Sequence, residues 1–453
     1  MFSRKMLNDL RIWKETPKQK PLILRGARQV GKTSAVRIFG QEFDNFIELN
    51  LEQPAHRQIF QRELPLKDLW QAILLVGNTT LNRGDTLLFI DEIQNAPEAI
   101  AYLRYFHEQL PHLHVISAGS LLEMRIGAKQ ISFPVGRVEF LYMYPLSFIE
   151  YLNAAGITQS VDLIQQVPFP EYALDTVLRH FHRYTLVGGM PEVIGRYLET
   201  ENVSSLGPLY HALLQTYMDD AEKYASSSAK VIRHCIETAP FEVGKRIKFS
   251  GFGQSNYKSK EISEALRTLQ QAMLMRLLYP TTSVEIPAQR NRKKSPRLQF
   301  LDTGLINHAV GLQDQFFKYQ NLHPMHRGLL AEHIVGQELL CHSSLNAEPL
   351  FWVREKKQSV AEIDYVVPHQ GYLIPVEVKA GKSGTLRSLH QFMDQCDHTY
   401  AVRLHAHSLA IVDVCTPAGK TFKLLNLPYF LAGQIHDYLD WFLKPQICTD
   451  GPR

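Results

Sequence analysis

The sequence has 453 residues, of which 45% are hydrophobic and 21% are charged. This composition is typical of globular proteins and excludes a largely disordered or fibrous chain. At about 100–200 residues per domain, the length predicts about three domains. The five cysteines are dispersed and form no CxxC pair, which excludes a disulfide framework and favours a reducing compartment. Because the N-terminus has no apolar leader segment and no run approaches the ~18 apolar residues of a membrane span, we expect a cytoplasmic protein without membrane contact.

The formal net charge of +4 is unevenly distributed along the chain. Residues 223–297 contain 15 Lys and Arg against 5 Asp and Glu, so the rest of the chain is mildly acidic. A basic segment of this kind favours a polyanionic partner such as DNA, or else forms a solvated basic surface with no partner.

The first 150 residues alternate short apolar runs with amphipathic stretches. We expect strands at residues 21–24, 46–50, 86–90, 114–118 and 138–141, and helices between them. The run at 86–90 is continuously apolar, as in a strand that is buried on both faces. The alternation predicts an α/β fold in which helices cover both faces of a parallel sheet.

The remaining residues fall into three further segments. Helical patterns broken by Pro and Gly predict a helical lid. A helix beginning at Ser259, followed by an apolar run, the basic residues 289–297 and a second apolar run, predicts a winged-helix-like unit with a hairpin tip. A long helix and several strands follow. The predicted domains are therefore an α/β core at 1–150, a helical lid at 151–222, a winged-helix-like basic domain at 223–300 and a C-terminal α/β domain at 301–453.

A phosphate-binding motif lies between the first strand and the first helix of the sheet. Its residues match GxxxxGK[ST]: Gly26, Ala27, Arg28, Gln29, Val30, Gly31, Lys32 and Thr33, with Ser34 next. In such a loop the backbone N–H groups and the helix N-terminus bind phosphate. We expect Lys32 to contact the β- and γ-phosphates of ATP and Thr33 to bind Mg²⁺.

Polar residues at the ends of later strands complete the predicted nucleotide site. Asp91 and Glu92 end the buried strand, and we expect Asp91 to hold Mg²⁺ through its water shell and Glu92 to orient the attacking water. Ser117 or Ser120 is a candidate sensor of the γ-phosphate, or else a helix cap. Arg137 is a candidate finger for a neighbouring subunit's nucleotide, or else part of a surface salt bridge.

Several motifs together resemble a known family. The segments GARQVGKT, LLFIDEIQ, SAGS, PLSFIEYL, GGMPEVI and FLDTGL resemble prokaryotic AAA+ ATPases that carry a C-terminal domain of unknown function related to PD-(D/E)xK nucleases. The resemblance runs over nearly the whole chain. It implies an ATPase core, a helical lid, a winged-helix-like middle, a restriction-endonuclease-like C-terminal domain and a homo-oligomer.

The C-terminal third contains a second candidate site. Glu377 and Lys379 are two residues apart at the end of a strand and so project from one face. A preceding hairpin can bring Asp364 alongside them, and Glu332 on the preceding helix can add a third carboxylate. Carboxylates that share Mg²⁺ or Mn²⁺, with a lysine near the attacking water, suit phosphodiester hydrolysis. The alternative is a solvated strand face.

The resemblance to PD-(D/E)xK nucleases places Glu332, Asp364, Glu377 and Lys379 at that family's positions, with Ile363 where many members have Pro. A set of histidines has no recognisable metal-binding spacing, and we interpret them as surface residues: His323, His326, His333, His390, His398, His405 and His407.

The leading hypothesis is a Mg²⁺-dependent ATPase that binds DNA and couples its nucleotide state to a metal-dependent DNA nuclease domain. The alternative is an ATP-dependent switch or scaffold whose C-terminal domain binds nucleic acid or protein without cleaving it. A protein-remodelling AAA+ machine is a third hypothesis.

Overall fold

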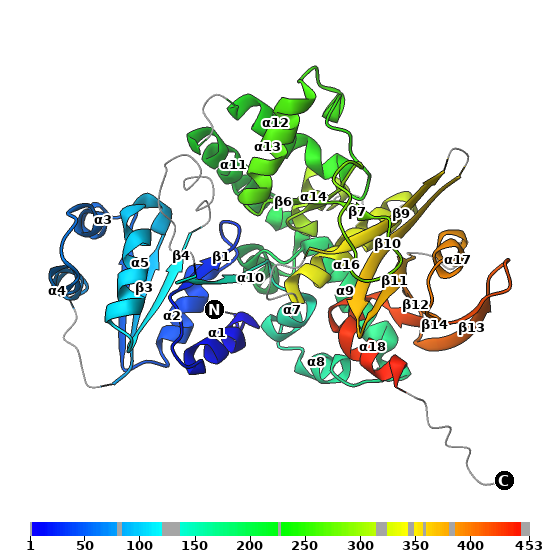
Figure 1. Ribbon diagram of the computed structural model, residues 1–453, viewed down its shortest axis with the longest axis horizontal. Helices are drawn as coiled ribbons and strands as arrows, with labels where there is room; N and C mark the ends of the chain where they lie inside the picture. The colour runs from blue at the N-terminus through cyan, green and yellow to red at the C-terminus, as the bar shows by residue number, and fades with distance from the viewer. Residues whose placement is uncertain are drawn as a thin grey trace, which may run out of the picture.

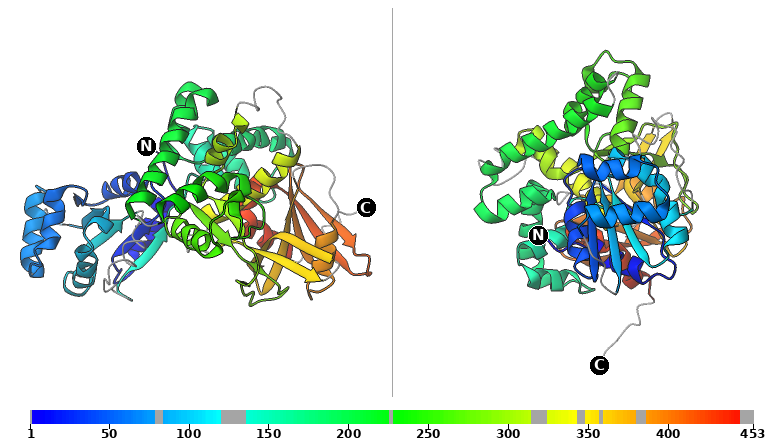
Figure 2. Two further views of the ribbon diagram at one scale, coloured as in Figure 1. Left: turned by 90° about the horizontal axis from the view of Figure 1, so that it is seen from above. Right: turned by 90° about the vertical axis from the view of Figure 1, so that its left-hand side faces the viewer.

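The computed structural model describes residues 2–78, 84–119, 136–224, 228–313, 324–342, 348–356, 359–379 and 386–444. Two β-sheets lie at opposite ends of the molecule, and helices fill the space between them (Figure 1). The view from above shows the same order (Figure 2). No helix in the described ranges is long and apolar enough to cross a membrane.

The N-terminal sheet is parallel and has the strand order β2-β3-β4-β1-β5. Its strands are β1 (Leu22–Arg25), β2 (Asn45–Asn50), β3 (Thr86–Asp91), β4 (Leu113–Ala118) and β5 (Glu139–Tyr142). All five strands expected from the sequence are therefore confirmed. Because the strands are parallel, their carboxyl ends meet at one edge, where the phosphate-binding loop and Asp91 lie.

Helices cover both faces of this sheet. They are α1 (Met6–Glu15), α2 (Lys32–Gly40), α3 (Pro54–Gln61), α4 (Leu66–Val76), α5 (Glu98–Gln109) and the short η1 (Ile93–Asn95). Strand β3 alternates between the two cores: Leu87 and Phe89 share a cluster with α1 and α2, while Leu88 and Ile90 share one with α3, α4 and α5. This two-sided burial accounts for its unbroken apolar run.

The middle of the chain is helical. It comprises α7 (Phe148–Ala154), α8 (Thr158–Ile164), η2 (Glu171–Ala173), α9 (Leu174–Val187), α10 (Pro191–Thr200), η3 (Val203–Leu206), α11 (Gly207–Tyr224), α12 (Ala229–Glu242), η4 (Phe252–Gln254) and α13 (Ser259–Gln271). The segment predicted as a lid packs against the C-terminal part: the Tyr184 hydroxyl lies 2.8 Å from the Glu338 carboxyl group, and the backbone N–H of Phe169 donates to the Tyr438 hydroxyl over 3.0 Å.

Strands β6 (Met275–Leu278) and β8 (Arg297–Phe300) form the predicted antiparallel pair after α13. The connection between them does not project freely. Within it, β7 (Pro280–Thr281) joins the C-terminal sheet beside β9 (Leu350–Lys356). Two basic side chains of the connection form ion pairs there, Arg290 with Glu348 and Lys294 with Glu355. The basic run therefore lies against the C-terminal part, because β7 anchors it.

The C-terminal sheet has seven strands in the order β13-β14-β12-β11-β10-β9-β7. Besides β7 and β9 it contains β10 (Ser359–His369), β11 (Tyr372–Val378), β12 (Tyr400–His405), β13 (Ala410–Cys415) and β14 (Thr421–Pro428). The accompanying helices are α14 (Thr303–Ala309), α16 (Pro324–His342), α17 (Arg387–Met393), η5 (Tyr429–Gln434) and α18 (Ile435–Leu443). The β10–β11 hairpin expected from the sequence is present.

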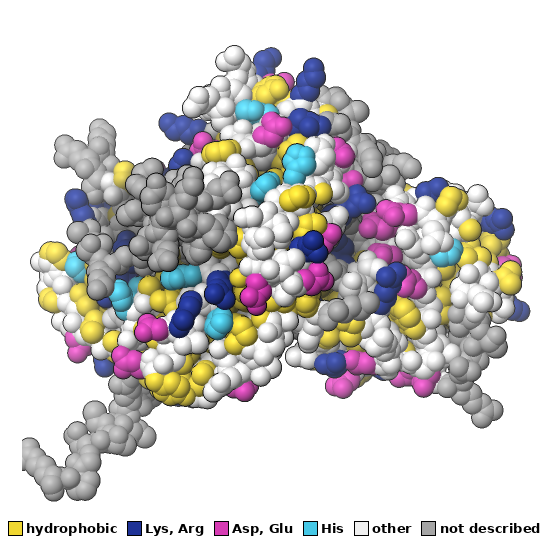
Figure 3. Space-filling model, turned by 180° about the vertical axis from the view of Figure 1, so that it is seen from behind, with side chains coloured by type: hydrophobic (Ala, Val, Ile, Leu, Met, Phe, Trp, Pro, Cys, Tyr) yellow, Lys and Arg dark blue, Asp and Glu magenta, His cyan; other side chains and the backbone are white. Residues whose placement is uncertain are grey.

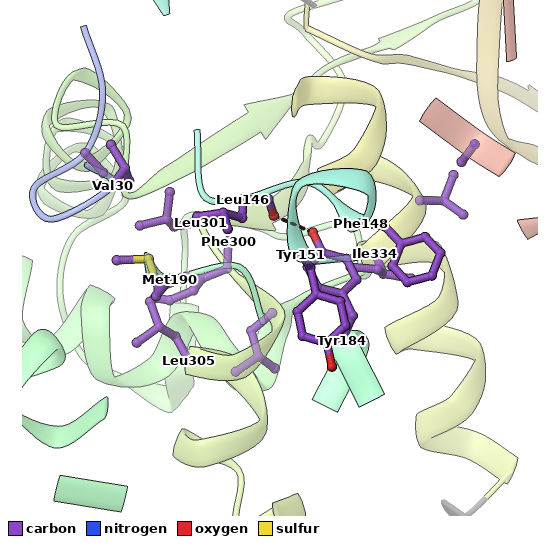
Figure 4. Packing of buried hydrophobic residues seen from close by; sticks show 14 of the residues in the cluster. Val30, Leu146, Phe148, Tyr151, Tyr184, Met190, Phe300, Leu301, Leu305 and Ile334 are labelled. Carbon is purple, nitrogen blue, oxygen red and sulfur yellow. Dashed lines mark hydrogen bonds between the residues drawn. The ribbon is translucent and has the colours of Figure 1, made fainter. Parts of the chain in front are cut away.

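One hydrophobic core links the three parts of the chain. The same cluster contains Val30 of the phosphate-binding loop, Phe148 and Tyr184 of the helical region, and Phe300 and Ile334 of the C-terminal part. The close view shows these side chains, with the Tyr184 hydroxyl donating to the Leu146 carbonyl over 2.7 Å (Figure 4). The segments predicted as separate domains thus share one continuous packed interior.

The interpretation of the histidines as surface residues is wrong for His333, His398 and His405, which are buried. Burial lowers the pKa of His333 to about 3 and that of His405 to about 4, so both are neutral at pH 7. The ring Nε2 of His333 accepts the Phe300 backbone N–H over 3.1 Å. These rings lie in the interior of the protein rather than at its solvent-exposed surface.

Candidate nucleotide site and C-terminal carboxylate cluster

The phosphate-binding loop needs glycine at both ends of its motif. A Cβ at Gly26 would lie 2.5 Å from the Met143 carbonyl oxygen, which is too close for any side chain. Gly31 precedes α2 with φ of 98°, a left-handed conformation that glycine adopts readily. No side chain caps the first turn of α2. Its N–H groups are therefore available to an anion, as in other phosphate-binding loops.

Lys32 is buried inside the loop. Its Nζ donates to the carbonyl oxygens of Gly26 over 3.0 Å and Ala27 over 2.8 Å. Burial lowers the pKa of Lys32 to about 8, although the carboxylates of Glu92 and Asp91 act to raise it. An incoming phosphate would add negative charge beside this ammonium and favour its protonated form.

Thr33 and the two acids meet at the carboxyl end of β3. The Thr33 hydroxyl donates to Asp91 Oδ2 over 2.7 Å, and Asp91 Oδ1 accepts the Glu92 N–H over 3.0 Å. Glu92 has φ of 53° and also accepts a hydrogen bond from Gln94. Burial raises the pKa of both Asp91 and Glu92. The predicted Mg²⁺-binding pair and the predicted water-orienting acid therefore lie side by side.

These residues fit ATP and Mg²⁺. The uncapped first turn of α2 and buried Lys32 suit a polyphosphate. The Thr33 hydroxyl and Asp91 carboxylate are oxygen ligands of the kind that Mg²⁺ prefers, and they already lie next to each other. Ser34 follows on α2 with an exposed side chain.

Arg4, which lies just before α1, supports the loop, a role that the sequence did not indicate. Its guanidinium donates to the carbonyl oxygens of Val30 over 2.8 Å and Tyr144 over 2.6 Å, and to Glu150 over 3.0 Å. Glu150 also forms a capping box with Ser147 at the start of α7. The PLSFIEYL motif therefore helps to hold the phosphate-binding loop in place.

Arg28 connects the loop to α11. Its guanidinium lies 2.7 Å from Asp220 and 3.8 Å from Glu52. The Tyr217 hydroxyl donates to the Arg28 carbonyl over 2.9 Å. A change in the loop can thus reach the helical region directly.

The other residues predicted for this site have different surroundings. The buried Ser117 hydroxyl donates to the Leu22 carbonyl over 3.3 Å, inside the sheet. Ser120 lies outside the described residues. Arg137 forms an exposed ion pair with Glu108 over 3.0 Å, so its surroundings match the salt-bridge alternative, and a role on a neighbouring subunit stays a prediction.

The FLDTGL and GGMP motifs contact each other. Asp302 caps α14 through the N–H groups of Gly304 and Leu305 and accepts the Gly189 N–H over 2.5 Å. A Cβ at Gly188 would lie 2.2 Å from an Asp302 oxygen. Burial raises the pKa of Asp302 to about 6. In this structure the two motifs serve packing between the helical region and β8.

The four residues predicted for the C-terminal site come together. Asp364 Oδ2 accepts the Val378 N–H over 2.8 Å, and Lys379 lies 2.5 Å from Glu377. Burial, followed by the charge of Asp364, raises the pKa of Glu332 to about 8 and that of Glu377 to about 7. Burial is the larger cause of both shifts, and the charge of the neighbouring Asp364 adds to it.

Arg297 of β8 enters this cluster. Its guanidinium lies 3.3 Å from Asp364 Oδ1 and 3.9 Å from Glu332, and it also contacts Glu362. Both Asp364 oxygens therefore have partners within the chain. Burial opposes the charge of Arg297, but Asp364, Glu362 and Glu332 together raise its pKa above its usual value. The guanidinium supplies the positive charge that these acids need.

The cluster does not fit a metal ion in this arrangement. Within the part of the chain that the structure describes, no three His, Cys, Asp or Glu side chains are placed to hold one. In this structure Arg297 and Lys379 lie against these acids, and metal binding by Glu332, Asp364 and Glu377 stays a prediction.

Comparison with known families matches three models. Residues 18–152 match an AAA domain, residues 178–315 a domain of unknown function (DUF8612) and residues 327–429 another domain of unknown function (DUF4143). The comparison with curated proteins found no match. The AAA match spans the phosphate-binding loop and the Asp91–Glu92 pair, so the chain contains an AAA-type P-loop ATPase domain.

Solved structures with similarity include the Walker-type ATPase PABY2304 of Pyrococcus abyssi, at 16% identity and a TM-score of 0.45, covering 68% of this chain and 96% of that one. The ORC2 protein of Aeropyrum pernix has 12% identity and a TM-score of 0.34, and the match covers 69% of this chain and 94% of that one. The ORC1 protein of the same organism, in complex with DNA, has 14% identity and a TM-score of 0.27, and the match covers 70% of this chain and 92% of that one.

Proposed function

We propose that the protein is a Mg²⁺-dependent ATPase. The observation that carries this proposal is the contact of Thr33 with Asp91, with Lys32 enclosed in the loop and Glu92 adjacent. Bound Mg²⁺ would neutralise charge that develops on the phosphates. Lys32 and the loop N–H groups would hold the β- and γ-phosphates, and Thr33 and Asp91 would hold the cation.

Glu92 is the residue proposed to act on water. Its carboxylate lies beside Asp91 at the sheet edge, and burial raises its pKa, which makes it a stronger proton acceptor. The Gln94 contact fixes one of its oxygens. Glu92 would therefore orient the attacking water and accept its proton.

The decisive experiment compares Glu92→Gln, Lys32→Ala and a surface control, Glu42→Gln, whose side chain pairs with Arg11 on the outside of the protein. Glu92→Gln is expected to bind ATP with Mg²⁺ but to lose at least about 100-fold in turnover, the usual contribution of a positioned base. Lys32→Ala is expected to lose both binding and turnover, and the control to lose neither. Turnover retained in Lys32→Ala would refute the proposal.

DNA binding by the basic middle of the chain is the second part of the proposal. The supporting observation is the excess of Lys and Arg over residues 223–297. On the face seen in Figure 3, several Lys and Arg side chains lie over the upper part of the molecule, where α12 and α13 lie, and others are spread over the rest of this face. The ion pairs of Arg290 and Lys294 reduce the charge available on the connection between β6 and β8, and leave Arg292 and Lys293 exposed.

For the C-terminal domain, the internal charge balance favours the switch or scaffold reading over nuclease action. Convergence of Asp364, Glu377, Lys379 and Glu332 keeps a Mg²⁺- or Mn²⁺-dependent nuclease as the second candidate. The test incubates the protein with either cation and with single-stranded, duplex and branched DNA. Cleavage that Asp364→Ala and Lys379→Ala both abolish would support the nuclease, and its absence on every substrate would leave the scaffold reading.

A further inference from the structure

A cleft separates the nucleotide-binding sheet from the α13–β6 unit. It has a volume of about 410 Å³ and draws its walls from three parts of the chain. Arg25 and Gly26 lie on the side of the sheet, at the start of the phosphate-binding loop. The volume lies within the ~300–1,000 Å³ typical of small-ligand sites, which is too small for a double helix but large enough for a short stretch of a single strand.

The walls of the cleft are strongly basic. Its charged lining residues are Arg25, Arg267, Arg276, Arg290, Arg292 and Glu348. Glu348 lies 3.3 Å from Arg276 and 3.6 Å from Arg290, so one carboxylate holds two guanidinium groups in place. Arg267 and Arg292 have no acidic partner among the described residues. Arginines therefore outnumber acids among the described residues that line the cleft.

The chemistry of these walls favours phosphate together with bases. A guanidinium group can bind a phosphate group through two parallel hydrogen bonds. Tyr142 of β5 and Tyr279, which follows β6, line the same cleft, and aromatic rings beside arginines are the surface on which unpaired bases stack. An inorganic anion has no base that could stack on these rings.

The position of the cleft links it to the nucleotide site. Gly26 lines the cleft, and its carbonyl oxygen accepts the Lys32 ammonium over 3.0 Å. A strand lying against Gly26 therefore touches the loop that would hold the ATP phosphates. Any effect of one ligand on the affinity of the other must be reciprocal.

We propose that this cleft binds the backbone of single-stranded nucleic acid and couples that binding to the nucleotide site. The inference deepens the proposed DNA binding and rests on it, but it names a different surface and a different substrate from the duplex expected for a winged helix. The arginines, rather than the start of α13, make the main contacts.

The test uses two pairs of substitutions that remove the same charge from the full-length protein. Arg267→Ala with Arg292→Ala removes the two cleft arginines without acidic partners. The control, Lys258→Ala with Lys260→Ala, removes two lysines at the start of α13 that do not line the cleft. Binding of a fluorescent 15-nucleotide oligo(dT) and of a matched duplex is measured by anisotropy over a range of salt concentrations.

The arginine pair is expected to weaken oligo(dT) binding at least ~10-fold and to reduce the salt slope by about 1.4, the value for two phosphate contacts on a single strand. The control pair is expected to change both by far less. ATP with Mg²⁺ should shift the oligo(dT) affinity of the wild type but not of the arginine variant.

Four outcomes would overturn the proposal. Equal weakening by both pairs would mean diffuse charge rather than a site. Loss of duplex binding by the lysine pair, with oligo(dT) binding unchanged by the arginine pair, would place DNA binding on α13 and leave the general proposal standing. Competition by free ATP or polyphosphate at the cleft, without any oligo(dT) binding, would assign it to a small phosphate ligand. If the protein bound no DNA but still hydrolysed ATP, the DNA-binding proposal would be wrong and the ATPase proposal would stand.

Discussion

Replacing Arg297 with alanine is expected to destabilise the C-terminal part of the molecule by about 3–5 kcal/mol, the usual cost of removing one partner from a buried ion pair. The Arg297 side chain is only 10% exposed and contacts three acids. It also packs 4.8 Å above the Phe351 ring, a contact that alanine loses. Without the guanidinium, buried Asp364 loses the cation that lies against its Oδ1.

The size of this loss should depend on pH. The remaining carboxyl groups can avoid repulsion by binding protons, which is easier at low pH. The variant should therefore lie closer to wild type at pH 5 than at pH 8. The pKa of Glu332, already about 8 beside Arg297, should rise further once the cation is gone.

Urea unfolding measures the loss of stability, and hydrogen exchange of the β10 peptide shows this loss locally. Lys294→Ala is the matched control, because Lys294 forms an ion pair from the same connection but lies at the surface, where such a pair contributes about 0–1 kcal/mol. A loss below about 1 kcal/mol for Arg297→Ala would refute the reasoning. Stabilisation of this variant alone by Mn²⁺ would mean that the guanidinium occupies the place of a metal ion.

Three further outcomes follow from the site. ATP binding at pH 8 should take up close to half a proton, because Lys32, with a pKa of about 8, is half neutral before binding; calorimetry in buffers of different ionisation enthalpy measures this, and Lys32→Arg, which stays charged, should take up less. Arg4→Ala should raise the ATP concentration needed for half-maximal turnover, because Val30 loses its donor; an unchanged value would exclude support of the loop. Asp302→Ala should lower stability by about 2–4 kcal/mol, since the N–H of Gly189 and those of α14 lose their acceptor; urea unfolding unchanged from wild type would contradict this.

The parts of the fold that could be predicted from sequence depend on local patterns. An unbroken apolar run predicts strand β3, because both faces of this strand are buried. The phosphate-binding loop follows from glycines whose spacing reflects backbone geometry. The β10–β11 hairpin follows from alternation around a turn at Gln370 and Gly371, both with positive φ. In each case the cause lies within a few residues of the effect.

The residues that sequence reasoning missed act across long separations. Arg4 contacts Glu150, 146 positions away, and Arg297 contacts Asp364, 67 positions away. A lone arginine carries no local sign of its partner. Arg297 ends the basic run of the sequence, but Leu298 and Phe300 after it place it at the beginning of a buried strand. The buried His333 was missed for the same reason, since its partner Phe300 is distant in sequence.

The position of β8 gives a structural basis for communication between the two candidate sites. Arg297 at its first residue enters the carboxylate cluster, and Asp302, five residues later, receives the N–H of Gly189. The turn at Gly189 in turn accepts the Leu146 N–H over 2.7 Å, next to the Ser147–Glu150 capping box that holds Arg4 against the phosphate-binding loop. Buried hydrogen bonds and ion pairs therefore connect that loop with Arg297 of the C-terminal cluster. Because buried contacts of this kind switch between discrete arrangements more readily than they stretch, we propose these contacts as the route by which nucleotide binding would alter the charge balance of the second site.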